Sequence, residues 1–149
     1  MRNMSMQIVK KGDAPDIDWQ ALAALLRRAG LGDRDAVKLK QAYQNSQFYW
    51  LGYADNQIIA TARAISDFTY ASYLADVAIS PEYQGRGYGN LLMNEIMATL
   101  SQYGKTFIYS VPDKIGFYKK YGYHILATGM VYANPQEIER LRGVGYLAD

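Results

Sequence analysis

The 149-residue sequence predicts one domain, spanning residues 1–149, of the mixed α/β (α+β) class, in which a mostly antiparallel sheet is flanked by helices. Half of the residues are hydrophobic, which suits one buried core in a chain too short for two domains. Three strand-like segments with short turns lie between residues 47 and 79, and the strongest helical pattern follows them. The expected element order is βααβββαβαββα.

The charge and the residue types exclude several kinds of protein. The formal net charge is +2 and the isoelectric point is near 8.7, less basic than a dedicated nucleic-acid binder requires. The chain has no cysteine, so disulfides, thiolate nucleophiles and zinc–thiolate sites are ruled out. Residues 1–11 lack the apolar core of a signal peptide, and no uncharged apolar run is long enough to cross a bilayer. We therefore expect a cytoplasmic protein that binds neither nucleic acid nor membrane.

The amino-terminal segment predicts a short strand and a helix. Residues 6–9 are apolar except for Gln7 and are expected to form the strand. Asp16 or Asp18 can cap a helix over residues 19–28, because a carboxylate accepts hydrogen bonds from the first free N–H groups of a helix. Gly30 suits the position after its last turn.

A second helix is expected over residues 34–43, with Asp33 as its cap. Its apolar stripe consists of Val37, Leu39 and Tyr43.

Three antiparallel strands are predicted next. Residues 48–54 and 58–65 are rich in aromatic and β-branched residues, and residues 55–56 form the hairpin turn between them. A second turn near Asp67 leads into a third strand over residues 70–79. Short connections of this kind join antiparallel neighbours.

The longest helix is expected after this meander. Pro81 ends the third strand because proline has no N–H for a ladder bond. A helix over residues 90–103, closed by Gly104, is indicated by apolar residues four positions apart. These residues are Leu92, Ile96 and Leu100.

The remaining chain predicts three strands and two helices. Residues 106–111 indicate a buried strand, parallel to the third strand because a helix connects the two. Asp113 can cap a short helix that Gly122 ends, and two short strands are expected at residues 123–127 and 129–133. The last helix begins with a cap, a proline and an acid, which are Asn134, Pro135 and Glu137.

A glycine-rich loop between the third strand and the long helix predicts an anion site. Its backbone N–H groups can converge on an anion, glycine allows close approach, and the helix dipole and an arginine add positive potential. A tight turn is the alternative, while a Walker loop and a Rossmann loop do not fit the spacing or the position. The residues are Gln84, Gly85, Arg86, Gly87, Tyr88 and Gly89.

This loop and a second segment resemble motifs of the GNAT family of N-acetyltransferases. The acyl-CoA loop of that family has the form Gln/Arg-x-x-Gly-x-Gly/Ala, which Gln84, Gly87 and Gly89 fill. Residues 116–123 resemble the family's Phe-Tyr-x-x-x-Gly-Phe segment, with Tyr123 in place of the last phenylalanine. Together with the element order, the two motifs cover nearly the whole chain.

The resemblance implies an acetyl-CoA-dependent enzyme in which a primary amine attacks the acetyl thioester directly, within a ternary complex. The backbone of Val77, Ala78 and Ile79 would pair with the pantetheine arm, where the third strand splays from the next one. Residues 84–89 and Asn90 would hold the pyrophosphate. Homodimers are common in that family, so the resemblance allows a homodimer, and no metal is expected.

The same resemblance makes Tyr118 the general acid and a contact of acetyl-CoA, because a departing thiolate needs a proton or a hydrogen-bond donor. An aromatic packing role is the alternative. The amine must also lose a proton, and Asp76 is the candidate general base. Burial could raise the pKa of Asp76, but it could equally be a structural partner of the backbone or of Arg63. Asp67, in a turn, is the other candidate.

The acceptor is expected to be a small primary amine, with an arylalkylamine favoured. Segments such as residues 62–67 and 129–132 are similar to the plant-type serotonin N-acetyltransferase branch. A protein or peptide amine, and an acetyl-CoA sensor without transfer activity, remain as alternatives. His124 is expected to be a half-exposed strand residue, since no second histidine or cysteine could share a metal with it. Aromatic residues that could line the acceptor pocket or the core are Trp19, Tyr43, Phe48, Tyr49, Trp50, Phe68, Tyr70, Tyr73 and Tyr132.

Overall fold

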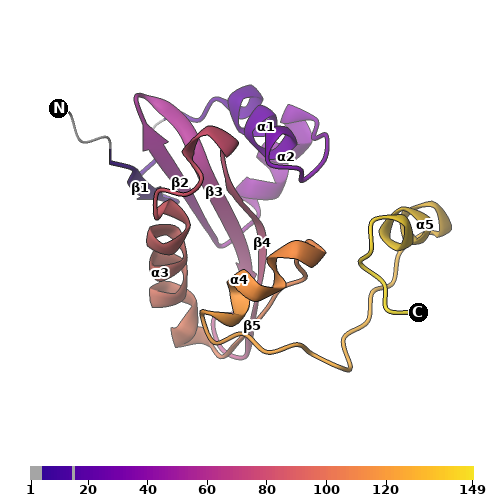
Figure 1. The fold of residues 1–149 in the computed structure, drawn as a ribbon. Helices are drawn as coiled ribbons and strands as arrows, with labels where there is room; N and C mark the ends of the chain where they lie inside the picture. Colours follow the sequence, from indigo (N-terminus) through magenta and orange to yellow (C-terminus); the bar gives the residue numbers. More distant parts are fainter. Residues whose placement is uncertain (1–4, 15) are drawn as a thin grey trace. The chain divides into compact units, whose positions relative to one another are not determined.

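The computed structural model of the chain describes residues 5–14 and 16–149. It divides into two compact units, Met1–Ile108 and Tyr109–Asp149. In the described part of the first unit, α1 and α2 cover one face of a five-stranded sheet and α3 covers the other (Figure 1). This arrangement confirms the predicted mixed class with a mostly antiparallel sheet.

The strands of this sheet lie side by side in the order in which they occur in the sequence. They are β1 (Gln7–Lys10), β2 (Phe48–Ala54), β3 (Gln57–Ser66), β4 (Ala71–Ile79) and β5 (Lys105–Phe107). Neighbours are antiparallel except β4 and β5, which run parallel as predicted. The predicted length and burial of the last strand are wrong, because its pairing with β4 covers only three residues and none of them is buried.

The turn between β2 and β3 consists of Asp55 and Asn56, with φ angles of 53° and 61°. Two successive left-handed residues make a type I′ turn, whose twist matches that of the strands it joins. Aspartate and asparagine tolerate this conformation better than other residues with a side chain. The predicted hairpin is confirmed.

The first helix, α1 (Trp19–Arg28), begins at the second of its two candidate caps. The Asp18 carboxylate accepts a hydrogen bond from the Ala21 N–H at 3.1 Å. Gly30, with a φ of 85°, follows the helix as expected.

The second helix, α2 (Ala36–Gln44), begins two residues later than predicted. Its cap is Asp35, whose carboxylate accepts a hydrogen bond from the Lys38 N–H at 3.0 Å, so the prediction of Asp33 is wrong. Val37 is also exposed rather than buried, because it lies on the side of α2 away from the sheet. The core on this face consists of Leu22, Leu25, Leu26, Leu39, Tyr43, Leu51, Ile58 and Ala78.

The long helix, α3 (Tyr88–Leu100), covers the other face of the sheet, and its buried side chains are Tyr88, Leu92, Met93, Ile96 and Leu100. It begins two residues earlier than predicted, with Gly87 at the cap position. A 3₁₀ turn extends it to Gly104, where any β-carbon would meet the carbonyl oxygen of Tyr70.

The second unit contains α4 (Ile115–Lys119) and α5 (Pro135–Gly143). The predicted start of α5 is confirmed, since the Asn134 side chain accepts a hydrogen bond from the Glu137 N–H at 2.8 Å. Asp113 lies within a 3₁₀ turn and does not cap α4, so that prediction is wrong.

The strands predicted at residues 123–127 and 129–133 are absent from the second unit, all of whose residues are described. This stretch is irregular (Figure 1). A strand requires a neighbour that satisfies its N–H and C=O groups, and an apolar pattern alone does not supply one. His124 is accordingly an exposed residue of irregular chain rather than a half-exposed strand residue.

Candidate active site

The open edge of β4 lies at the centre of the candidate site. Pairing between β4 and β5 ends at Tyr73 and Phe107, so the rest of β4 pairs only with β3 within the described first unit. The Ser80 N–H donates to the Ile59 carbonyl oxygen of β3 at 2.7 Å. Because neighbouring residues of a strand direct their amides to opposite edges, the amide of Ile79 faces away from β3. This open edge contains the residues that the sequence predicted for the pantetheine arm.

A β-bulge interrupts β4 just before this edge. Arg63 of β3 pairs with Ala75, whereas Thr61 pairs with Ala78, so β4 has one residue more than β3 at this point. The bulge begins at Asp76, whose backbone is left-handed, with a φ of 56°. The bulge changes which residues of β4 beyond it face the open edge.

The Asp76 side chain is buried and accepts hydrogen bonds from two arginines. Arg34 donates from both terminal nitrogens, at 2.8 and 3.2 Å, and Arg63 donates from Nε at 2.7 Å. The carboxylate is 8% exposed, compared with 16% for Arg63 and 29% for Arg34. Arg63 was predicted as a partner of Asp76 from the sequence, whereas Arg34, which lies in the loop between α1 and α2, has no sequence pattern that identifies it.

The charge state of Asp76 follows from these contacts. Burial raises the pKa of its carboxyl group, but the hydrogen bonds and positive charges of Arg34 and Arg63 outweigh it and lower the pKa overall. Asp76 is therefore a firmly ionised carboxylate with its oxygens already engaged. The raised pKa expected for a general base is not found, and this geometry favours the structural alternative, an ion pair with Arg63.

The turn residue Asp67 has a similar structural explanation. Its carboxylate accepts hydrogen bonds from the N–H groups of Thr69, Tyr70 and Ala71 at 2.7–3.1 Å. These backbone donors lower the pKa of Asp67. The contacts close the turn between β3 and β4.

The glycine-rich loop leads from β4 into α3 with an open approach. Gly85 and Gly87 have φ angles of 78° and 83°, and a β-carbon built at either position would meet no heavy atom within 4 Å. Gly87 caps α3, and the Leu91 N–H donates the first helical bond to its carbonyl oxygen at 3.2 Å. The Gln84 side chain, in turn, donates to the Ile79 carbonyl oxygen at 3.1 Å and ties the loop to the open edge of β4.

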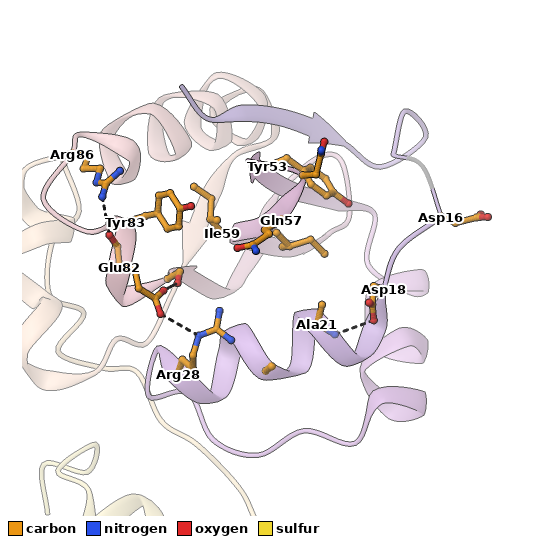
Figure 2. A pocket seen from close by; sticks show the side chains of 14 residues that line it. Asp16, Asp18, Ala21, Arg28, Tyr53, Gln57, Ile59, Glu82, Tyr83 and Arg86 are labelled. Atoms are coloured by element: carbon orange, nitrogen blue, oxygen red, sulfur yellow. Dashed lines mark hydrogen bonds and ion pairs between the residues drawn. The ribbon is translucent and has the colours of Figure 1, made fainter. Parts of the chain in front are cut away.

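The Arg86 guanidinium lies on the Tyr83 ring, 4.9 Å from its centroid, and donates to the Glu82 carbonyl oxygen at 3.3 Å. It lines a pocket of about 900 Å³ between α1, the β2–β3 hairpin and the loop (Figure 2). Arg28 of α1 faces Glu82 across this pocket at 4.0 Å. Both arginines can therefore supply positive charge beside the loop.

Tyr118 lies in α4 of the second unit among other aromatic rings. The rings of Phe117 and Tyr123 lie with their centroids 5.1 and 5.8 Å from that of Tyr118. Burial, with a smaller contribution from Tyr123, raises the pKa of Tyr118 to about 12. The phenol is therefore a proton donor throughout the neutral range.

The aromatic residues predicted for an acceptor pocket separate into different environments. Tyr43 and Trp50 are buried core residues, and Tyr43 shares a hydrogen bond of 2.7 Å with the Thr61 hydroxyl group. Near the end of α3, Phe48 stacks on Tyr103, and Phe68 meets both rings edge to face. Only part of the predicted set can therefore face an acceptor.

Neither a cluster of metal-ligating side chains nor a membrane-spanning helix is found among the described residues. Across residues 5–14 and 16–149, no group of three or more His, Asp or Glu side chains is placed to hold a metal ion. Over the same stretch, no helix reaches the length and apolarity needed to span a membrane.

Solved structures support the fold. The chain superimposes on a GNAT family acetyltransferase from Streptococcus pneumoniae with a TM-score of 0.71 and 22% identity, covering 88% of this chain and 99% of that one. A GNAT family acetyltransferase from Elizabethkingia anophelis, solved with acetyl-CoA bound, gives a TM-score of 0.63 and 18% identity, covering 87% and 89%.

Sequence comparison identifies the family. Over 113 residues the chain is 30% identical to serotonin N-acetyltransferase 2, chloroplastic, of Oryza sativa subsp. japonica, a match covering 72% of this chain and 56% of that protein. The chain spans about half the length of such curated relatives. Residues 45–125, more than half of the chain, match the family model described as the acetyltransferase (GNAT) domain. The chain therefore belongs to the GNAT family of acetyltransferases.

Proposed function

We propose that this chain is an acetyl-CoA-dependent N-acetyltransferase that transfers an acetyl group directly to a small primary amine. The observation that carries the proposal is the open amino-terminal end of α3, where Gly85 and Gly87 leave space for a phosphate group. The first N–H groups of a helix have no partner within the helix and favour an anion. The solved relative with bound acetyl-CoA supports this choice of anion.

In this proposal residues 84–89 and Asn90 hold the pyrophosphate, and the open edge at Val77, Ala78 and Ile79 pairs with the pantetheine arm. The amine nitrogen attacks the thioester carbonyl carbon, the carbon–sulfur bond breaks and the amide forms. The thiolate then accepts a hydrogen bond or a proton from Tyr118, whose raised pKa keeps its hydroxyl group protonated. The amine proton leaves through ordered water, because Asp76 is engaged by two arginines.

The acceptor class is supported by one relative. Serotonin N-acetyltransferase 2 of rice is named for an arylalkylamine, and the matching segment covers 72% of this chain. We therefore propose an arylalkylamine acceptor for this chain as well.

We further propose that both units form one domain that acts as a homodimer in the cytoplasm. The family match crosses the boundary between the units, which supports one domain. Exposed apolar residues of the second unit support an interface in place of the strands expected there, and they include Ile125, Leu126, Met130 and Tyr132. Size-exclusion chromatography with light scattering measures the oligomeric state, and a monomer would remove this part of the proposal.

Free-thiol release from acetyl-CoA across a panel of amines tests the main proposal, with coenzyme A binding measured in parallel. The panel includes tryptamine, serotonin, phenethylamine, polyamines and lysine peptides. We expect fastest release with an arylalkylamine. Release only with lysine peptides would identify a protein acceptor, binding without release would indicate a sensor, and no binding would overturn the proposal.

A further inference from the structure

Asp76 has a conformation that the rest of its strand does not require. The described residues with a side chain and a positive φ are Asp55, Asn56, Phe68 and Asp76. The first three lie at the turns between strands, whereas Asp76 lies inside β4. A left-handed residue with a side chain persists within a strand only when its surroundings hold it there.

The surroundings of Asp76 hold its carboxylate from two directions. Arg34 reaches it from the α1–α2 loop with a bidentate pair of hydrogen bonds, and Arg63 reaches it from β3. Each arginine is itself fixed, because Arg34 also donates to the Leu31 carbonyl oxygen at 3.2 Å and Arg63 to the Ser46 hydroxyl at 3.4 Å. The side chain of Asp76 is therefore anchored directly to the α1–α2 loop and to β3, and through Arg63 to Ser46, which follows α2.

The contacts that hold Asp76 also affect the backbone groups at the open edge of β4. A residue inserted into a strand reverses the alternation of the residues that follow, so the bulge decides how Val77 and Ile79 present their backbone groups. An extended Asp76 would remove the extra residue from the ladder. The amides that face the open edge would then change.

We propose that Arg34, Asp76 and Arg63 form a positioning cluster, in which the two arginines hold Asp76 left-handed so that the open edge of β4 can receive the pantetheine arm. This inference rests on the proposed acetyl-CoA-dependent function. The cluster acts through the backbone of β4, and none of its three side chains takes or gives a proton in the reaction.

Three substitutions at Asp76 separate backbone conformation from charge. Asp76→Ala removes the carboxylate and disfavours the left-handed conformation, Asp76→Gly removes the carboxylate but allows that conformation, and Asp76→Asn keeps an oxygen acceptor without the charge. By isothermal titration calorimetry, we expect acetyl-CoA affinity to fall about tenfold for the alanine variant, because fewer molecules hold the bulge. The Asp76→Gly and Asp76→Asn variants should lose less acetyl-CoA affinity than the alanine variant.

The matched control is Asp55→Ala at the β2–β3 turn, where φ is 53°. It places the same unfavourable left-handed alanine outside β4 and should leave acetyl-CoA affinity unchanged. Circular dichroism confirms the fold of every variant. If Asp76→Ala does not fold, Arg34→Lys replaces it, because lysine keeps the charge but loses the bidentate geometry and should weaken affinity in the same way.

Steady-state kinetics give the second measurement. If the cluster positions β4, Asp76→Ala should raise the KM for acetyl-CoA more than it lowers kcat. Asp76→Gly should raise this KM less than Asp76→Ala does. An unchanged affinity for a folded alanine variant would overturn the inference, as would equal losses for glycine and alanine. A large fall in kcat at constant KM in all three variants, with loss of the acidic limb of the pH profile, would instead make Asp76 the general base. Failure of the wild-type protein to bind acetyl-CoA would overturn the proposed function itself.

Discussion

Individual residues determine the backbone geometry around the candidate site. Gly85 and Gly87 are left-handed where the loop enters α3, and glycine adopts this conformation without steric cost. Asp76 adopts it inside β4 with the help of two arginines. Substitutions at these positions therefore act first on the backbone and only then on any ligand.

Gly87→Val should weaken acetyl-CoA binding by at least about tenfold, because the new side chain would occupy the space proposed for a phosphate. The variant should also lose about 1–2 kcal/mol of stability from its left-handed valine. Gly12→Val is the control, since Gly12 has a φ of 98° and equally open surroundings. If calorimetry gives the same acetyl-CoA affinity for both variants, the pyrophosphate does not bind at this loop.

Tyr118→Phe should lower kcat about a hundredfold and leave acetyl-CoA affinity nearly unchanged, because it removes one hydroxyl group. With a pKa of about 12 for Tyr118, the wild-type rate should show no fall from its ionisation between pH 7 and 10. Tyr121→Phe, a neighbour on the same unit, is the control and should retain full rate. A full-rate Tyr118→Phe enzyme would leave Tyr118 with its packing role alone.

At this scale the sequence predicted some features of the site and not others. The loop glycines have a motif, and two of them, Gly85 and Gly87, have the positive φ angles that a tight loop requires. Of the two partners of Asp76, Arg63 was predicted because it lies on the adjacent strand. Arg34 was not predicted, because it is 42 residues away in the sequence. A left-handed aspartate inside a strand has no sequence pattern, since it depends on tertiary contacts.

At the scale of elements, helix caps test the assignment of boundaries. Asp35→Ala should lower the free energy of unfolding by about 1 kcal/mol, because it removes the hydrogen bond to the Lys38 N–H. Asp33→Ala should change it by less than about 0.5 kcal/mol, as a surface substitution. Urea unfolding of the two variants measures the difference, and the reverse order would place the cap where the sequence alone predicted it.

Local patterns predicted elements well where the partner is close in sequence. The β2–β3 hairpin was predicted correctly because a two-residue turn with a recognisable composition joins two strands that follow each other directly in the sequence. The strands expected at residues 123–127 and 129–133 were wrong, because alternation shows which residues are apolar but not which strand they pair with.

At the scale of the whole molecule, the buried cluster links stability to pH. Because Arg34 and Arg63 lower the pKa of Asp76 below its value in the unfolded chain, the cluster contributes stability above that unfolded pKa of about 3.9. This contribution is lost as the pH falls through the folded pKa. The advantage of wild type over Asp76→Asn in urea unfolding should therefore be full at pH 7 and smaller at pH 3. A difference that does not change with pH would mean that the ion pairs contribute nothing.

The sequential order of the strands also describes how the chain can fold during synthesis. β2, β3 and β4 pair through short turns, so the centre of the sheet can form while later residues are still being made. The pairing of β1 with β2 closes a loop that contains α1 and α2, and the pairing of β5 with β4 closes a loop that contains α3. These longer loops cost more conformational entropy than the two turns do. The glycine-rich loop follows β4 directly and leaves the ribosome before β5, whereas the unit that contains Tyr118 is synthesised only after the complete sheet.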